Sequence, residues 1–98
     1  MIRIGIGITT YMRKENMEAL MHSINHNTNI PYTLFFAVDG STDGTDAILQ
    51  AYRKEYTYGP NVGPEQNKNR IFRRFSQYNY IIIIDDDMLI TNPKWFYR

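Results

Sequence analysis

Three adjacent aspartates, Asp85, Asp86 and Asp87, come directly after four consecutive isoleucines in this chain. An unbroken isoleucine run is typical of a central strand in a parallel sheet that is covered on both faces. In open α/β sheets, ligands bind outside the carboxyl ends of the strands, which is where these carboxylates come. Because adjacent carboxylates repel one another, a hard divalent cation, Mg2+ or Mn2+, suits this all-oxygen group. Such an ion usually binds together with phosphates, so the pattern predicts a metal–diphosphate site.

Two further polar segments follow apolar strands earlier in the chain. Ile2–Ile8 alternates β-branched residues with glycine and arginine, which predicts a strand, and Thr9–Arg13 follows it as a polar turn. Thr33–Val38 predicts a second strand, and Asp39–Thr45 follows it as a loop punctuated by glycine. In a parallel sheet these loops open at the same edge as the loop after the isoleucine strand. We therefore expect all three polar segments to face one another.

Helical spacing of apolar residues predicts three helices between the strands. The residues that mark them are Met17, Leu20, Met21 and Ile24; Ile48, Ala51 and Tyr52; and Ile71, Phe72 and Phe75. Asp43 or Thr45 is the expected N-cap of the second helix, and Pro64 suits the first turn of the third. With a short edge strand at Tyr56–Tyr58, the order is β-α-β-α-(β)-α-β. This alternation predicts an α/β fold with a Rossmann-like, mostly parallel sheet and flanking helices.

The third helix places one basic residue on its predicted inward face. At about 100° per residue, Lys68 falls between Phe75 and Phe72 when Ile71 is taken as the origin. Arg70 and the other arginines of this helix are predicted to point elsewhere. Lys68 is also close to a helix N-terminus, which favours anions, so it is a candidate contact to phosphate.

Length, charge and composition restrict the class of protein. The chain has 98 residues, enough for one domain at most, and its net charge of +1 does not call for nucleic acid as a partner. It has no cysteine, which excludes disulfides and thiolate metal sites and fits a reducing, cytoplasmic compartment. No apolar run reaches the length of a membrane span, and the N-terminus lacks the apolar core of a signal peptide.

Motifs at the predicted strand ends and on the third helix occur together in one known family. They are Thr9-Thr10-Tyr11-Met12-Arg13, Val38-Asp39-Gly40-Ser41-Thr42-Asp43-Gly44-Thr45, Asn61-Val62-Gly63 with Asn67-Lys68-Asn69, and Asp85-Asp86-Asp87, with Pro93 and Trp95-Phe96 where the family begins its next helix. In this order they resemble the N-terminal half of an inverting family-two glycosyltransferase with the nucleotide-diphospho-sugar transferase (GT-A) fold. The resemblance covers nearly the whole chain.

The resemblance implies a nucleotide-diphospho-sugar donor such as a UDP-sugar, an acceptor that it does not identify, and Mn2+ or Mg2+ as cofactor. It implies that Asp39 accepts from the imide nitrogen of the base, and that Asp87 is favoured as the direct metal ligand. The implied nucleotide-binding residues are Thr9, Thr10, Tyr11, Arg13, Asp39, Lys68, Asp85 and Asp86, and the implied metal ligands are Asp85 and Asp87. The metal would neutralise the leaving diphosphate as a Lewis acid.

The chain departs from the family pattern at two positions and ends soon after the acidic motif. Val38 stands where the family has the first of two paired aspartates, and Lys68 stands where it has arginine. The family's acceptor-binding half, with its catalytic carboxylate, follows the acidic motif. We therefore expect residues 1–98 to be the nucleotide-sugar-binding part of a GT-A domain, truncated after that motif, with no catalytic residue of its own. A bare strand edge and exposed Trp95–Tyr97 would then favour self-association.

Other interpretations of these residues and of the chain stay open at this level. The acidic run is alternatively a solvated loop, Asp39 an Asx-turn residue of the Gly40–Thr45 loop, Arg13 a surface charge, and Lys68 a lysine whose stem covers an aromatic ring. A non-catalytic nucleotide-binding or interaction module is the alternative function. A phospho-acceptor receiver domain fits poorly because the first predicted strand ends in threonines rather than acids.

Overall fold

The computed structural model describes residues 2–87, which form alternating strands and helices. The elements are β1 (Ile4–Thr10), α1 (Lys14–Asn27), β2 (Thr33–Asp39), α2 (Thr45–Ala51), β3 (Tyr56–Gly59), α3 (Pro64–Arg74) and β4 (Tyr80–Asp85). Their order is the predicted one, and the short strand at Tyr56 is present. The expectations for Pro93 and for Trp95–Tyr97 lie outside the described residues.

All four strands of the sheet are parallel, in the order β3-β2-β1-β4. The α/β fold class is therefore confirmed. The predicted central position of the isoleucine strand is wrong for residues 2–87, because β4 forms an edge of this sheet and pairs there with β1 alone. Accordingly Ile81, Ile82 and Ile83 are half-buried and only Ile84 is fully buried. The central positions belong to β1 and β2.

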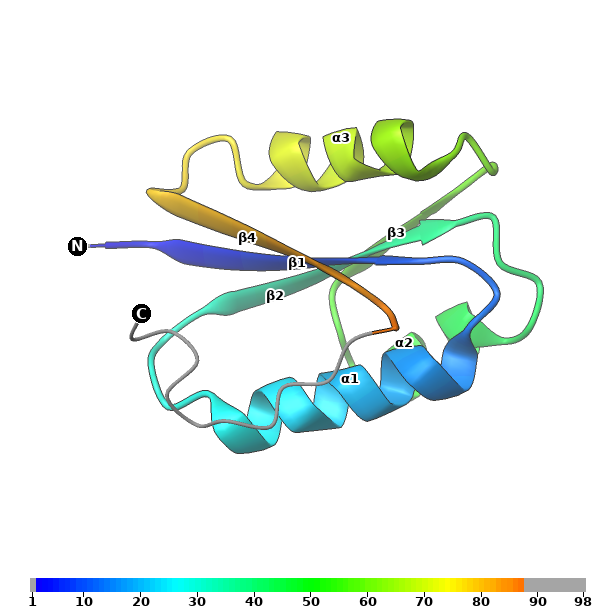
Figure 1. The fold of residues 1–98 in the computed structure, drawn as a ribbon, viewed down its shortest axis with the longest axis horizontal. Coiled ribbons are helices and arrows are strands. Elements are labelled where there is room, and N and C mark those ends of the chain that lie inside the picture. Colours follow the sequence, from blue (N-terminus) through cyan, green and yellow to red (C-terminus); the bar gives the residue numbers. More distant parts are fainter. Residues whose placement is uncertain (1, 88–98) are drawn as a thin grey trace.

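Helices cover both faces of the sheet: α1 and α2 lie on one side and α3 on the other (Figure 1). Ile6 and Ile8 of β1 point to the first side, where they pack with Met17, Leu20 and Ile24 of α1. The smaller core on the second side contains Phe35, Ala37, Ile71 and Phe75. The predicted apolar stripe of α1 is thus confirmed, and each face of the sheet has its own cluster of buried residues.

Glycine in β1 sets the distance between the sheet and α3. Gly5 and Gly7 alternate with the isoleucines and face α3, where a Cβ added to Gly5 would lie 2.6 Å from the Phe75 ring and one added to Gly7 would collide with Ile71. The absence of side chains at these two positions allows α3 to approach the strand backbone directly. The start of α3 is thereby held close to the carboxyl ends of β1 and β2.

No helix formed by residues 2–87 has both the length and the apolar character that a membrane crossing requires.

Candidate functional site

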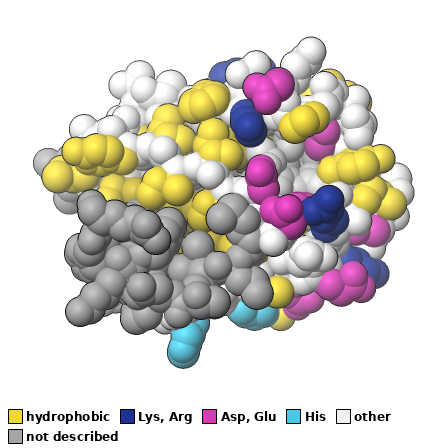
Figure 2. Space-filling model, viewed as in Figure 1, with side chains coloured by type: hydrophobic (Ala, Val, Ile, Leu, Met, Phe, Trp, Pro, Cys, Tyr) yellow, Lys and Arg dark blue, Asp and Glu magenta, His cyan; other side chains and the backbone are white. Residues whose placement is uncertain are grey.

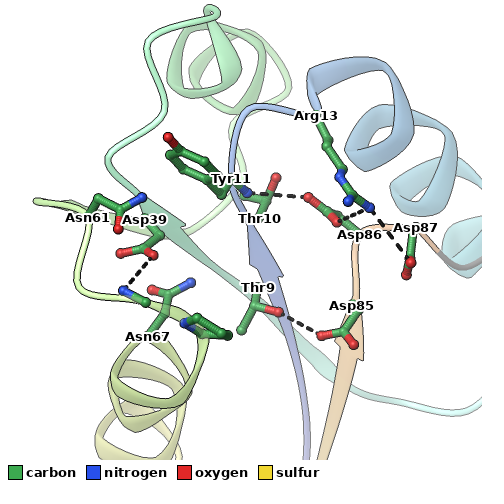
Figure 3. A pocket seen from close by; sticks show the side chains of 12 residues that line it. Thr9, Thr10, Tyr11, Arg13, Asp39, Asn61, Asn67, Asp85, Asp86 and Asp87 are labelled. Atoms are coloured by element: carbon green, nitrogen blue, oxygen red, sulfur yellow. Dashed lines mark hydrogen bonds and ion pairs between the residues drawn. The ribbon is translucent and has the colours of Figure 1, made fainter.

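A cavity of about 460 Å³ lies at the carboxyl ends of β1, β2 and β4. The predicted residues that line it are Thr9, Thr10, Tyr11, Arg13, Asp39, Asp85, Asp86 and Asp87. Lining residues that the sequence analysis did not assign to the site are Asn61, Gly63, Pro64 and Asn67. Figure 3 shows Asp39, Asn61 and Asn67 on one side of the cavity, the three aspartates on the other, and Thr9 to Tyr11 between them. The three polar segments therefore meet at one edge of the sheet, as expected.

The three aspartates of the acidic end differ in their surroundings. Asp85 lies beside Thr9 across the paired strands, and the Thr9 hydroxyl donates to its carboxylate at 3.1 Å. Asp86 is 7% exposed and accepts from the Tyr11 backbone N–H at 3.3 Å, so it fixes the turn after β1. Asp85 and Asp87 are exposed. Among the contacts within residues 2–87, Asp85 and Asp87 therefore each keep one carboxylate oxygen free for a ligand, whereas Asp86 is used by the fold.

Among residues 2–87, Arg13 is the cation that forms ion pairs with the acidic end. Its guanidinium lies 3.7 Å from a carboxylate oxygen of Asp86 and 3.7 Å from one of Asp87. Burial raises the pKa of the Asp86 carboxyl, while the Thr10 hydroxyl, the Tyr11 amide and Arg13 oppose that change. The Thr10 hydroxyl is buried, and no group among residues 2–87 completes a hydrogen bond of normal geometry with it. The Thr10 hydroxyl thus lies close enough to Asp86 to lower the pKa of that carboxyl, although no hydrogen bond of normal geometry joins the two groups.

Asp39 lines the end of the cavity opposite the three aspartates. It is 4% exposed, and its two oxygens accept backbone N–H groups from Val62 at 2.8 Å and Gly63 at 3.1 Å. The Asx-turn interpretation is therefore wrong: these contacts tie Asp39 to the Asn61–Gly63 loop that begins α3, not to the Gly40–Thr45 loop.

The predicted role of Lys68 as the inward basic residue is wrong. Lys68 is half-buried, pairs with Glu65 at 3.7 Å and does not line the cavity. Arg70, predicted to point elsewhere, is the inward one, with its guanidinium 3.4 Å from an Asp39 oxygen. The error came from assigning Phe72 to the apolar face, because Phe72 is 48% exposed.

The buried face of α3 runs instead through Asn67, Ile71 and Phe75, which follow one another at intervals of four residues. Asn67 is fully buried, and its side-chain amide donates to the Ala37 carbonyl at 2.9 Å. In the sequence, the four-residue spacing that places Asn67 on the same helix face as Ile71 and Phe75 was the signal that Asn67 is buried beside the cavity.

The glycine-punctuated loop that follows β2 mainly makes contacts that connect other parts of the fold. The Asp43 carboxylate accepts from the backbone N–H of Lys14 at 3.0 Å and of Thr45 at 3.2 Å, so it serves the N-termini of both α1 and α2. Gly44, with φ of 93°, is the N-cap residue of α2, rather than the expected Asp43 or Thr45. Ser41 and Met12 also link the two loops, since the Met12 N–H donates to the Ser41 hydroxyl at 2.9 Å.

The donor set at the acidic end fits a hard divalent cation that is partly ligated by substrate. Residues 2–87 contain no group of three histidine, cysteine or acidic side chains arranged to hold a metal. Mg2+ and similar ions are commonly bound through one or two carboxylates, with phosphate and water as the remaining ligands. Asp85 and Asp87 have exposed oxygens that could fill this role.

Solved structures with a similar fold include a mannosyltransferase. The mannosyltransferase PcManGT from Pyrobaculum calidifontis, in complex with GDP-Man and Mn2+, matches with a TM-score of 0.79 and 18% sequence identity over 94% of this chain and 29% of that chain. The S. aureus protein TarS 1-349 matches with a TM-score of 0.77 and 20% identity over 98% of this chain and 30% of that chain. The chain thus shares the α/β fold of these two proteins.

Residues 6–98 match the family model described as Glycosyl transferase family 2, and the chain belongs to this family. Among curated proteins, abequosyltransferase RfbV of Salmonella typhimurium strain LT2 is 33% identical in an alignment 73 residues long that covers 65% of this chain and 22% of that protein. The chain therefore spans between 22% and 30% of the length of these three relatives.

Proposed function

We propose that residues 1–98 bind a nucleotide-diphospho-sugar in the cavity, as the donor-binding part of a glycosyltransferase that transfers a sugar to an acceptor hydroxyl. The observation that carries this proposal is that one cavity is lined at one end by Asp39 and at the other by Asp85, Asp86 and Asp87. A carboxylate that accepts hydrogen bonds and a metal-binding acidic group match the two ends of a nucleoside diphosphate. Membership of Glycosyl transferase family 2 supports the reaction class.

At the Asp39 end, we propose a uracil base, so that the donor is a UDP-sugar. Ionised aspartate is an acceptor only, and the imide N–H of uracil is a matching donor. Tyr11 lines the same cavity with an exposed ring, which offers a flat apolar surface to the base.

At the acidic end, we propose that Asp87 and Asp85 hold Mn2+ or Mg2+ together with the diphosphate. The relative PcManGT was solved in complex with GDP-Man and Mn2+, which supports the use of a divalent ion. The bound ion would supply Lewis-acid neutralisation of the leaving diphosphate. Thr9 orients Asp85 through its hydroxyl, and Asp86 keeps the turn after β1 in place.

Calorimetric titration of the 98-residue chain with UDP, with and without Mn2+, tests this proposal. Asp87→Asn should remove the part of the affinity that depends on Mn2+, whereas Asp39→Asn should weaken UDP binding in both conditions by about tenfold or more, because an amide presents a donor where an acceptor is needed. Asp46→Asn, which makes the same change on α2 outside the cavity, is the matched control. A folded chain that binds UDP in neither condition would refute the proposal.

The alternative is a nucleotide-binding module without transferase activity. It is supported by the lining of the cavity, because its acidic residues among residues 2–87 are already proposed to serve the nucleotide, the metal and the turn after β1. UDP binding combined with an absence of turnover on every acceptor, also after the chain is joined to the remaining length of a relative, would favour it.

A further inference from the structure

Arg70 is a largely buried arginine whose hydrogen bonds converge on one end of the cavity. Its side chain is 14% exposed. One guanidinium nitrogen donates to the Asn67 side-chain oxygen at 2.9 Å, and to the Val38 carbonyl and an Asp39 carboxylate oxygen at 3.4 Å each. A second nitrogen donates to the Pro60 carbonyl at 2.8 Å. One planar group thus joins the end of β2, the loop after β3 and the first turns of α3.

The backbone around Arg70 leaves room for this group. A Cβ on Gly59 would lie 2.8 Å from the guanidinium, so the last residue of β3 must lack a side chain for the arginine to reach Pro60. Gly40, directly after β2, approaches the Asn61 backbone in the same way, with a Cβ position 2.7 Å from the Asn61 nitrogen. Both glycines bring the Gly59–Gly63 segment against the guanidinium and Asp39.

The contacts of Asp39 leave a defined acceptor position. One oxygen accepts from Val62 and from Arg70, and the other accepts from Gly63 alone. Each carboxylate oxygen can accept about two hydrogen bonds, so among these contacts the Gly63-bound oxygen keeps one free lone pair. Asp39 lines the cavity, and Arg70 is not among the residues that line it.

We infer that Arg70 is a positioning residue for recognition of the nucleobase. It fixes the rotation of the Asp39 carboxylate, and through Pro60 the loop that walls the cavity, so that the free lone pair is aimed at an N–H on the edge of the base. This inference rests on the proposed function. Uracil presents a donor N–H at its N3 atom, whereas cytosine presents an acceptor nitrogen there. Arg70 therefore controls the preference for uracil without contacting the base.

The test compares UDP and CDP binding, in the presence of Mn2+, to the full 98-residue chain and to its variants. The original chain should bind UDP about tenfold or more tightly than CDP, because cytosine leaves the Asp39 acceptor unsatisfied. Arg70→Met should bring the two affinities to within about threefold of each other, since the carboxylate is then free to rotate. Arg70→Lys should also lose most of the preference, because a point charge does not reproduce the guanidinium fork. Arg73→Met, on the exposed side of the same helix, should keep the preference.

A chemical rescue separates positioning from a purely structural role. Millimolar guanidinium added to Arg70→Ala should restore the UDP preference, and the same concentration of sodium chloride should not. A thermal melt of each variant reports folding. The inference is overturned if Arg70→Met keeps the original preference, if both nucleotides weaken by the same factor in Arg70→Met and Arg70→Lys, or if neither variant folds. If the original chain binds neither nucleotide, the proposed function itself fails, which is a distinguishable result.

Discussion

The Arg13 guanidinium lies 3.7 Å from a carboxylate oxygen of Asp87, the aspartate that we propose as a direct metal ligand. A protein cation therefore occupies part of the space around the acidic end of the cavity. A divalent ion that binds Asp87 has to compete with this ion pair. Because the Arg13 side chain is 53% exposed, the pair is screened by solvent and its contribution is small.

Arg13→Gln should accordingly strengthen binding of Mn2+ in the absence of nucleotide. The expected gain is roughly twofold to fivefold, since exposed ion pairs contribute about 0–1 kcal/mol. Calorimetry or the paramagnetic resonance signal of free Mn2+ measures it. Arg73→Gln removes an exposed arginine that bonds the Asn69 carbonyl, away from the cavity, and should leave the affinity unchanged. Weaker Mn2+ binding in Arg13→Gln would contradict competition.

Asp43→Ala should destabilise the fold more at neutral pH than in acid. Burial raises the pKa of Asp43, but hydrogen bonds from Thr45 and Lys14 outweigh it, so the pKa lies below its usual value of 3.8. The ionised carboxylate thus stabilises the folded state above pH 3.8, and this contribution is lost as the pH falls through the depressed pKa. By analogy with helix caps, the loss at neutral pH should be about 1–2 kcal/mol. Urea unfolding at several pH values measures this loss of stability. An equal loss at every pH would contradict the prediction.

Gly7→Ala should destabilise the chain by about 1–3 kcal/mol or more, because the new Cβ collides with Ile71. A double-mutant cycle with Ile71→Ala provides the control. Ile71→Ala alone should cost about 2–5 kcal/mol by leaving a cavity, and the methyl group introduced by Gly7→Ala partly fills that cavity in the double variant. Denaturant unfolding of the original chain, the two single variants and the double variant gives the coupling energy. Additive costs would mean that this contact does not set the packing of α3.

The 98-residue chain alone should bind donor without transferring sugar at a measurable rate. A general base must lie within hydrogen-bond reach of the acceptor hydroxyl, and the acidic side chains of the cavity are assigned to the nucleotide, the metal and the turn after β1. Release of UDP from a UDP-sugar, assayed with mixed acceptors, is the measurement. Turnover that disappears in Asp87→Asn would show that one of these residues also serves as the base.

Self-association through β4 is expected at moderate concentration. Among residues 2–87 this strand pairs on one side only, and Tyr80 at its start is 60% exposed. Figure 2 shows a band of hydrophobic side chains along the path that β4 takes in Figure 1. Tyr80→Lys should lower the apparent mass in light scattering, since an edge lysine opposes strand pairing. A monomeric original chain would contradict this expectation.

The sequence analysis predicted the element order, the parallel sheet and the edge at which the polar loops meet, because apolar periodicity and strand-end motifs depend on local sequence. It failed where a side chain's orientation depends on tertiary contacts. Phe72 looked like a core residue of α3, yet the glycines of β1 draw the helix in through Ile71 and Phe75, and Phe72 remains outside. Arg70 then turns inward to Asp39, and Lys68 pairs with Glu65 instead of lining the cavity.

The isoleucine strand shows a second limit of the same kind. Its composition indicates burial on both faces, but strand order depends on which backbones pair, and among residues 2–87 that places β4 at the edge. Composition alone could not distinguish the two positions.

The two glycines of β1 also determine the dimensions of the cavity, although neither lines it. They let the α3 backbone rest almost on the sheet, and the first turns of α3 carry Asn67 and Pro64 into the cavity wall. Any side chain added in the middle of β1 would lift that wall away from Asp85 and Asp87 on the opposite side. The distance that a ligand can span between the two ends of the cavity is therefore set by the absence of side chains at these two glycines.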